Sequence, residues 1–368
     1  MAVKADREYM IRALGLAERA RGKTSPNPMV GAVIVRNGEV VGEGYHHAAG
    51  MPHAEVNAIK AAGDKCRGAT IYVTLEPCCH RGRTGPCTQA IIDAGISRVV
   101  FAAKDPDPRV SGGGARQLRR AGLKVSSGLM RDEARRQNEI YFHVKEHQRV
   151  FVIVKTAQSL DGRIATVTGD SQWISCPESR RLAHKLRTEV DAVVVGGGTL
   201  KADNPALTVR HIKGKNPYRI VLAANPEFPR RCKLIDDNED CLTVFASTEE
   251  TVEKLSHQRR TQGAIFWTIK RDASGRLSLD DFMDKAYRFG IRSVMVEGGP
   301  TLVTSFFHSR LVDKYVLVSA PKMIGEGRAS IGSLDISKLS EAVLFENCTY
   351  ERVGADCIFI GYPKWGKN

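Results

Sequence analysis

The order of apolar and polar residues in the first 150 positions predicts helices alternating with strands. Residues 6–21 are expected to form an amphipathic helix, because five apolar side chains fall on one helical face: Met10, Ala13, Leu14, Ala17 and Ala20. Apolar runs at 29–36 and 39–45 flank Asn37-Gly38, which predicts a hairpin. Further strands are expected at 69–75, 98–103 and 123–127, and helices at 54–62, 86–94, 112–121 and 131–142. This alternation predicts a three-layer α/β/α domain.

A second α/β pattern follows. Strands are expected at 150–157, 191–196, 218–223, 242–246, 264–268, 293–297 and 314–319, and helices near 177–188, 249–258, 279–289 and 300–310. The charged stretch 132–149 has no core of its own and leads into an apolar strand, so we place a domain boundary near residue 148. A chain of 368 residues suits two domains, predicted at 1–148 and 149–368.

Composition narrows the class of protein. The chain is 42% hydrophobic and 26% charged, has no apolar stretch long enough to span a bilayer, and lacks a signal-peptide pattern at its start. Nine cysteines, an odd number, favour free or metal-bound thiols over a disulfide scaffold. We therefore expect a cytoplasmic protein that does not associate with membranes.

The net charge of +14 could reflect a nucleic-acid partner, a phosphate-bearing small molecule or only a basic surface. Lysines and arginines occur at most in short pairs, such as Arg119-Arg120, and no aromatic residues are interleaved with a long basic run. The pattern favours a phosphorylated small molecule or a merely basic surface, and we expect no nucleic-acid partner.

The first half contains His53-Ala54-Glu55 and, after a predicted strand, Pro77-Cys78 and Cys87. Either piece alone is common, and buried cysteines are often only small hydrophobic residues. Together they resemble the zinc deaminase signature, in which one His and two Cys hold zinc, a fourth position stays open for water, and a nearby Glu moves protons. The resemblance makes His53, Cys78 and Cys87 the zinc ligands and Glu55 the acid/base residue. Among the remaining candidates, His80 competes as a ligand, and Cys66 and Cys79 are taken as bystanders.

Eight residues separate Cys78 from Cys87, more than in the short loop of cytidine and nucleic-acid deaminases. This long loop resembles the deaminase domain of bifunctional riboflavin-biosynthesis proteins, as do three other motifs: Pro26-Asn27-Pro28-x-Val30-Gly31, Gly44-Tyr45-His46 and Asp105-Pro106. The resemblance implies a cytidine-deaminase-like fold, with Asn27 facing the substrate pyrimidine and the basic loop residues near its ribose phosphate. Cys79 and Gly85 depart from the Ser and Pro usual in that loop.

In the second half, polar and glycine-rich stretches follow predicted strands at 169–173, 196–199, 203–205 and 297–301. Physically they fit a ligand cleft or ordinary turns. The chain has no G-x-G-x-x-G fingerprint, so a Rossmann fold is not supported.

The same stretches occur in this order in the reductase domain of that family, which has a dihydrofolate-reductase-like fold. The resemblance implies NADPH contacts at Ala157, Trp173, Thr199, Asp203, Gly299, Pro300, Thr301, Leu302, Val303, Thr304 and Ser305. It implies substrate contacts at Lys155, Ser171, Arg187, Leu207, Arg210 and Glu297. Arg187 and Arg210 would hold the substrate phosphate, and Lys155 and Asp203 are candidates for orientation or proton supply.

The resulting hypothesis is zinc-dependent deamination of 2,5-diamino-6-(5-phosphoribosylamino)pyrimidin-4-one, followed by NADPH-dependent reduction of 5-amino-6-(5-phosphoribosylamino)uracil to the ribityl compound. One alternative is a nucleic-acid-editing zinc deaminase with a C-terminal RNA-binding module. Another is an enzyme in which one half is a non-catalytic scaffold. The family resemblance also implies a homo-oligomer, either a dimer or a tetramer.

Overall fold

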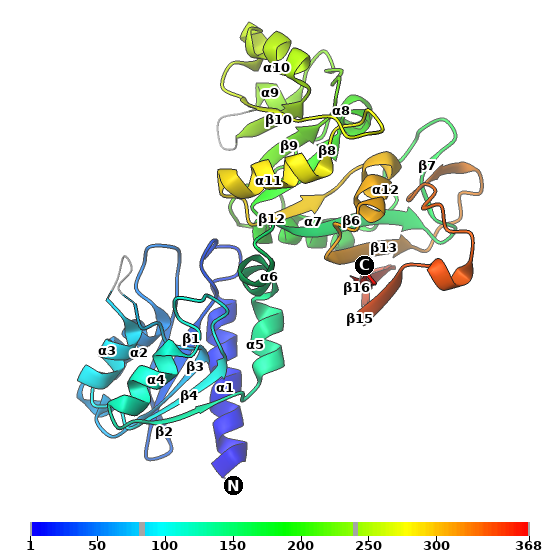
Figure 1. Cartoon of the computed structure of the whole chain (residues 1–368). Coiled ribbons are helices and arrows are strands. Elements are labelled where there is room, and N and C mark those ends of the chain that lie inside the picture. The colour runs from blue at the N-terminus through cyan, green and yellow to red at the C-terminus, as the bar shows by residue number, and fades with distance from the viewer. Residues whose placement is uncertain (1, 81–84, 238–241, 367–368) are drawn as a thin grey trace. The chain divides into compact units, whose positions relative to one another are not determined.

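The computed structural model describes residues 2–80, 85–237 and 242–366, and it divides into two compact units, residues 1–148 and 149–368 (Figure 1). Each unit is built from helices and strands that alternate along the chain. The α/β class predicted for both halves is confirmed. No helix within the described ranges is long and apolar enough to cross a membrane.

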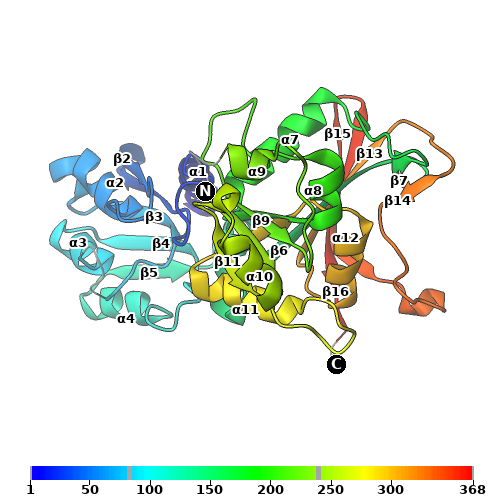
Figure 2. The same cartoon turned by 90° about the horizontal axis from the view of Figure 1, so that it is seen from above.

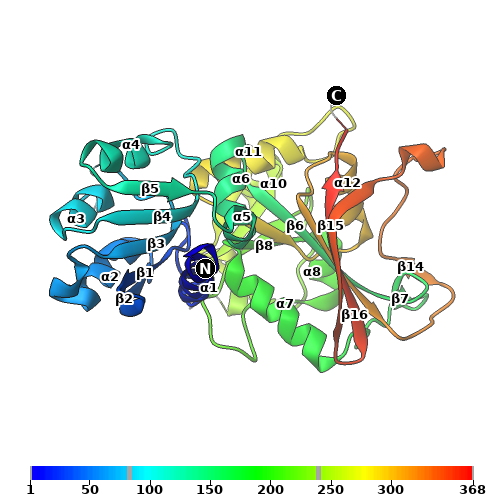
Figure 3. The ribbon, with the colours of Figure 1, turned by 90° about the horizontal axis from the view of Figure 1, so that it is seen from below.

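The first unit contains a five-stranded sheet in the order β2-β1-β3-β4-β5 (Figure 3). Antiparallel pairing joins β1 to β2 and β3, whereas β3, β4 and β5 run parallel. Asn37 and Gly38 have φ values of 52° and 84°, as a tight hairpin turn requires, so the predicted hairpin is confirmed. The strands are β1 (Gly31–Arg36), β2 (Glu39–Tyr45), β3 (Thr70–Leu75), β4 (Arg98–Ala103) and β5 (Lys124–Ser127).

Helices cover both faces of this sheet. Small and aliphatic residues of α2 (Ala54–Ala62), α3 (Cys87–Asp93) and α4 (Gly113–Arg120) share one core with it, and residues of α1 (Ala2–Glu18), α5 (Arg131–Gln137) and α6 (Glu139–His147) share another. The three-layer prediction is therefore right. The single helix expected at 131–142 is wrong, because Asn138 separates α5 from α6 and uses its side chain to pair with the backbone of Met29 at 2.7 and 2.9 Å.

The second unit contains a nine-stranded sheet in the order β11-β10-β9-β8-β12-β6-β13-β16-β15. The strands from β11 to β13 run parallel, and β16 and β15 are added antiparallel. Five of the parallel strands, β6, β8, β9, β10 and β12, are buried at most of their positions, as is typical of parallel strands covered on both faces. Their bounds are β6 (Phe151–Ser159), β8 (Ala192–Gly196), β9 (Tyr218–Leu222), β10 (Thr243–Ser247), β11 (Ile265–Thr268), β12 (Ser293–Val296), β13 (Lys314–Ala320), β15 (Leu344–Val353) and β16 (Asp356–Lys364).

The predicted helices of this unit are found as α7 (Pro177–Glu189), α10 (Glu249–Ser256), α11 (Leu279–Phe289) and α12 (Pro300–His308). Phe282 of α11 and Phe306 of α12 are fully buried against alternate strand residues such as Val194. The central parallel strands are thus held rigidly, which places their carboxyl ends with precision.

Several elements escaped prediction. They are the separate strand pair β7 (Arg163–Thr166) and β14 (Gly327–Ala329) (Figure 2), the short helices α8 (Gly197–Asp203) and α9 (Lys233–Asp236), and the final hairpin β15–β16. Three 3-10 turns also escaped, at Gly63–Cys66, Arg259–Thr261 and Leu339–Glu341. The edge strand β15 is exposed at most positions, so it lacks the apolar alternation that reveals a half-buried strand. Helix α8 begins with two glycines, which have low helix propensity.

Candidate functional site

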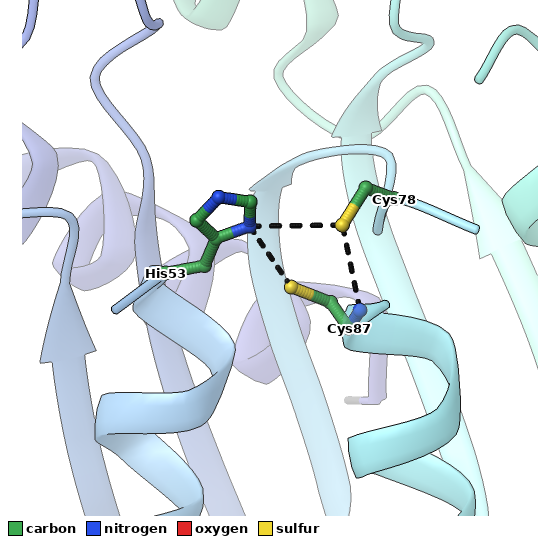
Figure 4. A group of neighbouring side chains, drawn as sticks. All are labelled: His53, Cys78 and Cys87. Carbon is green, nitrogen blue, oxygen red and sulfur yellow. Dashed lines mark hydrogen bonds between the residues drawn. The ribbon is translucent and has the colours of Figure 1, made fainter. Parts of the chain in front are cut away.

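Three elements of the first unit bring the predicted metal ligands together (Figure 4). His53 is the residue that precedes α2, Cys78 lies three residues beyond the end of β3, and Cys87 is the first residue of α3. Pro86 has φ −64° and ψ 133° ahead of α3, an extended conformation from which the helix starts at Cys87. The backbone N–H of Cys87 at this helix start points to the sulfur of Cys78, so it favours a thiolate at Cys78.

The ligand atoms have the spacing of a metal site. His53 Nδ1 lies 3.1 Å from Cys87 Sγ and 3.6 Å from Cys78 Sγ, and the Cys87 N–H donates to Cys78 Sγ at 3.4 Å. A tetrahedral zinc with ordinary bond lengths would hold such atoms roughly 3.5 to 3.8 Å apart. The distance from His53 to Cys78 falls in this range and the distance from His53 to Cys87 is shorter, while one imidazole and two thiols form a donor set that suits zinc. Within the described ranges this group does not include His80, and Cys79 instead contacts the Arg109 carbonyl at 3.7 Å.

The two thiols differ in acidity. The pKa of Cys78 is lowered, mainly because its sulfur accepts a hydrogen bond from Cys87. Burial opposes this effect, and a hydrogen bond from His53 adds to it. The same contact and burial raise the pKa of the Cys87 thiol. The pKa of His53 is raised, mainly by its hydrogen bond to Cys78. Cys78 is thus the thiol that loses its proton first, and a thiolate is the form that binds a metal.

Glu55 lies beside this group in the first turn of α2 and is 3% exposed. Burial raises its pKa to about 7, and the negative charge of Cys78 acts in the same direction. The Glu55 carboxyl also shares a hydrogen bond with the Cys87 thiol. A carboxyl group that titrates near neutrality can both take up and release a proton, which is the property of a general acid/base.

Asn27 is held by His46, a residue of the motif Gly44-Tyr45-His46 to which the sequence assigns no role. The Asn27 Nδ2 lies 3.1 Å from His46 Nε2, and His46 Nδ1 lies 3.2 Å from the Pro52 carbonyl. Burial lowers the pKa of His46, so the ring is neutral, donates from Nδ1 to the carbonyl and accepts from Asn27 at Nε2. The orientation of the Asn27 amide is therefore set. The basic loop residues Arg81 and Arg83 fall outside the described ranges.

In the second unit, the carboxyl ends of β8 and β12 lie side by side, because these strands pair in parallel. Each end leads through glycines into a helix, α8 or α12. The Gly299 N–H donates to Thr199 Oγ1 at 3.0 Å, so two of the predicted cofactor segments are in contact. Ligands of open parallel sheets bind at such carboxyl ends.

A charged cluster lies next to these turns. Arg187 of α7 donates to Glu297 at 2.5 and 3.2 Å and to the Thr208 carbonyl at 2.9 Å. The two side chains are only 12% and 10% exposed. Burial pushes the pKa of Glu297 upward, but the charges of Arg187 and Lys155 outweigh it and leave the pKa below its ordinary value. Glu297 is thus an ionised carboxylate whose Oε1 has no hydrogen-bond partner among the described residues.

The structure places Lys155 on β6, which pairs directly with β12. Burial lowers the pKa of its ammonium group, the negative charge of Glu297 opposes this, and the charge of Arg187 acts with burial. Arg210 donates from Nη1 to Thr208 Oγ1 at 3.1 Å, so both predicted phosphate-binding arginines contact Thr208. Arg187 has a carboxylate as its main partner in this structure, which the sequence did not reveal.

The remaining predicted residues have different environments. Leu207 and Val303 are 2% and 0% exposed, so a ligand would reach their backbone and not their side chains. Trp173 is 61% exposed and its ring lies 4.5 Å from the Arg180 guanidinium, on the loop after β7 that also carries Ser171. Asp203 is the last residue of α8.

Two polar residues near the cluster were missed. His184 of α7 is 6% exposed, and its Nδ1 accepts the Arg210 N–H at 3.1 Å. Asn216 accepts the Val209 N–H at 2.7 Å. Helical spacing could have revealed His184, because it lies three residues before Arg187 and shares its face of α7. Nothing in the local sequence singles out Asn216.

Comparisons with known proteins agree with both halves. Residues 3–103 match the cytidine and deoxycytidylate deaminase zinc-binding region, and residues 150–359 match the RibD C-terminal domain. Among solved structures, RibD of Acinetobacter baumannii is 32% identical, with a TM-score of 0.87 over 99% of this chain and 100% of that one.

Curated relatives match over almost the whole length. The riboflavin biosynthesis protein RibD of Aquifex aeolicus is 44% identical over 96% of this chain and 97% of its own. The RibD protein of Escherichia coli is 39% identical over 95% of this chain and 97% of its own. These matches show that the chain belongs to the RibD family of bifunctional riboflavin-biosynthesis deaminase/reductases.

Proposed function

We propose that residues 1–148 deaminate 2,5-diamino-6-(5-phosphoribosylamino)pyrimidin-4-one and that residues 149–368 reduce the product, 5-amino-6-(5-phosphoribosylamino)uracil, with NADPH. The observation that carries the proposal is the convergence of His53, Cys78 and Cys87 beside the buried acid Glu55. The family matches in both halves support it, and they do not favour the nucleic-acid-editing alternative.

In the deaminase unit, His53, Cys78 and Cys87 would hold zinc, which supplies the Lewis acidity that makes a water molecule nucleophilic near neutral pH. Glu55 takes a proton from that water and passes a proton to the departing amino nitrogen, so that water and the amine become a carbonyl and ammonia. Its pKa near 7 suits both transfers. Asn27, held by His46, presents its amide to the pyrimidine ring.

In the reductase unit, NADPH would supply the hydride that goes to C1 of the ribose. We assign its binding to Ala157, Trp173, Thr199, Asp203 and residues 299–305. The contact between Thr199 and Gly299 supports this assignment, because it brings two of these segments together.

Substrate binding is assigned to Lys155, Ser171, Arg187, Leu207, Arg210 and Glu297. Reduction opens the sugar ring, so a proton must reach the ring oxygen as the hydride arrives at C1. Lys155 is our candidate donor, because burial lowers its pKa and makes the ammonium group release a proton more readily. Glu297 uses one oxygen for Arg187 and keeps Oε1 as an acceptor for a substrate hydroxyl or amino group.

The proposal includes a cytoplasmic location and a homo-oligomer of two or four chains. The cysteines in the described part of the chain form no disulfide, which fits a reducing compartment. The oligomer is supported by the family resemblance. The substrate would be a phosphorylated pyrimidine and not a nucleic acid, and such a substrate suits the basic balance of the chain.

The test is product analysis by mass spectrometry. Zinc-loaded protein is mixed with the diaminopyrimidine substrate, once without and once with NADPH. We expect exchange of an amino group for oxygen in the first tube and a further gain of two hydrogens in the second. If neither change occurs while one equivalent of zinc is bound, the substrate assignment is wrong, and single-stranded nucleic acids become the next substrates to test.

A further inference from the structure

The segment 204–211 connects α8 to the chain that leads into β9, and residues 204–210 belong to no helix or strand. It carries Leu207 and Arg210, two of the residues assigned to the substrate. Its backbone is unusual, because three non-glycine residues have positive φ: Asn204 at 42°, Leu207 at 53° and His211 at 68°. Such conformations persist only where the surroundings hold them, and they are frequent at ligand-binding sites.

Side chains from outside the segment hold its backbone. The Ala206 carbonyl accepts from Arg219 at 3.4 Å, and the Thr208 carbonyl accepts from Arg187 at 2.9 Å. The Val209 N–H donates to Asn216, and the Arg210 N–H donates to His184. Each of these four backbone groups thus forms its hydrogen bond with one side chain, where it would otherwise pair in a sheet or with water. The shape of the segment depends on these side chains.

His184 holds the end of the segment that carries Arg210. Its Nδ1 can accept the Arg210 N–H at 3.1 Å only when that nitrogen has no proton. Burial lowers the pKa of His184 to about 4; the charges of Arg187, Arg210 and His211 act in the same direction, and Glu297 opposes them. The ring is therefore neutral at physiological pH, and the contact with the Arg210 N–H requires the tautomer that carries its proton on Nε2.

We propose that His184 is a positioning residue for the reduction, because its Nδ1 fixes the backbone of Arg210 and so directs the Arg210 guanidinium toward the substrate phosphate. This inference rests on the proposed function, in which Arg210 binds that phosphate. The guanidinium itself donates to Thr208 Oγ1 at 3.1 Å, which restricts its position further. Near the other end of the segment, the fully buried Arg219 donates to the Ala206 carbonyl and so holds the backbone there.

The test compares two substitutions of similar size. His184→Asn keeps an acceptor near the place of Nδ1, and His184→Leu removes it. With the deaminated intermediate supplied directly, His184→Leu should raise KM for this substrate roughly threefold to tenfold, as expected for one lost hydrogen bond, and change kcat much less. His184→Asn should restore KM. Hydrogen exchange of residues 204–211 should be faster in His184→Leu and near wild type in His184→Asn.

Some results would overturn the inference. Equal KM values and equal exchange in all three proteins would show that His184 positions nothing. An equal rise in KM in His184→Asn and His184→Leu would show that His184 acts through packing only. If His184→Leu does not fold, Asn216→Leu against Asn216→Asp makes the same comparison at Val209, and an unchanged KM in Asn216→Leu would again refute a held segment.

The two proposals fail separately. If wild type does not oxidise NADPH with the intermediate, the proposed function is wrong. Binding of inorganic phosphate, measured by calorimetry, and hydrogen exchange still test the inference in that case. Weaker phosphate binding and faster exchange in His184→Leu alone would support it, and unchanged values for both would refute it.

Discussion

The replacement Gly44→Ala should disable the deaminase unit from a position outside its chemistry. Helix α2, which carries Glu55 and follows His53, packs on β2 at Gly44 with backbone against backbone. A Cβ atom at Gly44 would lie 2.4 Å from the Ala58 nitrogen and 2.5 Å from the Ala54 carbonyl oxygen. Ordinary contacts of this kind begin near 3.4 Å. Helix α2 would have to move by about 1 Å, because the opposing atoms are backbone and cannot rotate away.

We expect two effects of that movement. Overpacking of this kind typically costs about 1–3 kcal/mol, so the first unit should unfold at a lower temperature. A displacement of about 1 Å in a catalytic group can lower a rate roughly 100-fold. Deamination should therefore fall by about two orders of magnitude, and zinc should bind less tightly, because His53 and Glu55 move relative to the two cysteines. Reduction of the deaminated intermediate should keep its wild-type rate.

The assay measures ammonia release and NADPH oxidation on the same preparation, together with zinc content and thermal unfolding. Gly15→Ala is the matched control. It lies within α1, where a Cβ would have no atom within 4 Å, and alanine in place of glycine in a helix should stabilise by roughly 0.5–1 kcal/mol.

Wild-type deamination and an unchanged unfolding temperature in Gly44→Ala would refute the reasoning, because they would show that α2 does not rest directly on β2. A loss of deamination of the same size in Gly15→Ala would show only that the first unit does not tolerate alanine in place of either glycine.

Three further predictions concern charged groups. Glu55→Gln should lower the rate of deamination roughly 100-fold to 10,000-fold, while zinc binding and reduction persist. A deamination rate near that of wild type would exclude Glu55 as the acid/base residue. Arg187→Met leaves the buried Glu297 carboxylate without its partner, so the second unit should lose about 3–5 kcal/mol of unfolding free energy in denaturant titrations. The double variant Arg187→Met/Glu297→Gln should lose less, because no buried charge is left unpaired. Equal losses in the two proteins would refute a buried ion pair. The pKa of His184 is lowered to about 4 in the folded protein, against about 6.5 for a histidine in the unfolded chain. Between these two pH values the unfolded chain binds more protons than the folded one, so the stability of the second unit should fall as pH falls through this window. His184→Asn should remove that part of the pH dependence, and an identical profile in both proteins would contradict it.

Much of the architecture could be predicted from local sequence. The period of apolar residues revealed the buried strands and long amphipathic helices, and Asn37-Gly38 revealed the first hairpin, because such signals depend on neighbours in the chain. Strand β15 and helix α8 could not be found in this way. The exposed β15 is held by pairing with β16, and the glycines at the start of α8 follow directly after the end of β8. Both depend on contacts with other parts of the fold.

The same division applies to the sites. The grouping of His53, Cys78 and Cys87 beside Glu55 could be expected from the sequence, because a metal site requires particular side chains at a recognisable spacing. The pairing of Arg187 with Glu297 and the support of residues 204–210 could not. The first two partners are 110 residues apart, and the side chains that hold residues 204–210 belong to three different segments. Local chemistry identifies the reactive groups. Only tertiary packing decides which buried charges meet and how a loop is held, because burial makes each polar group depend on a partner anywhere in the chain.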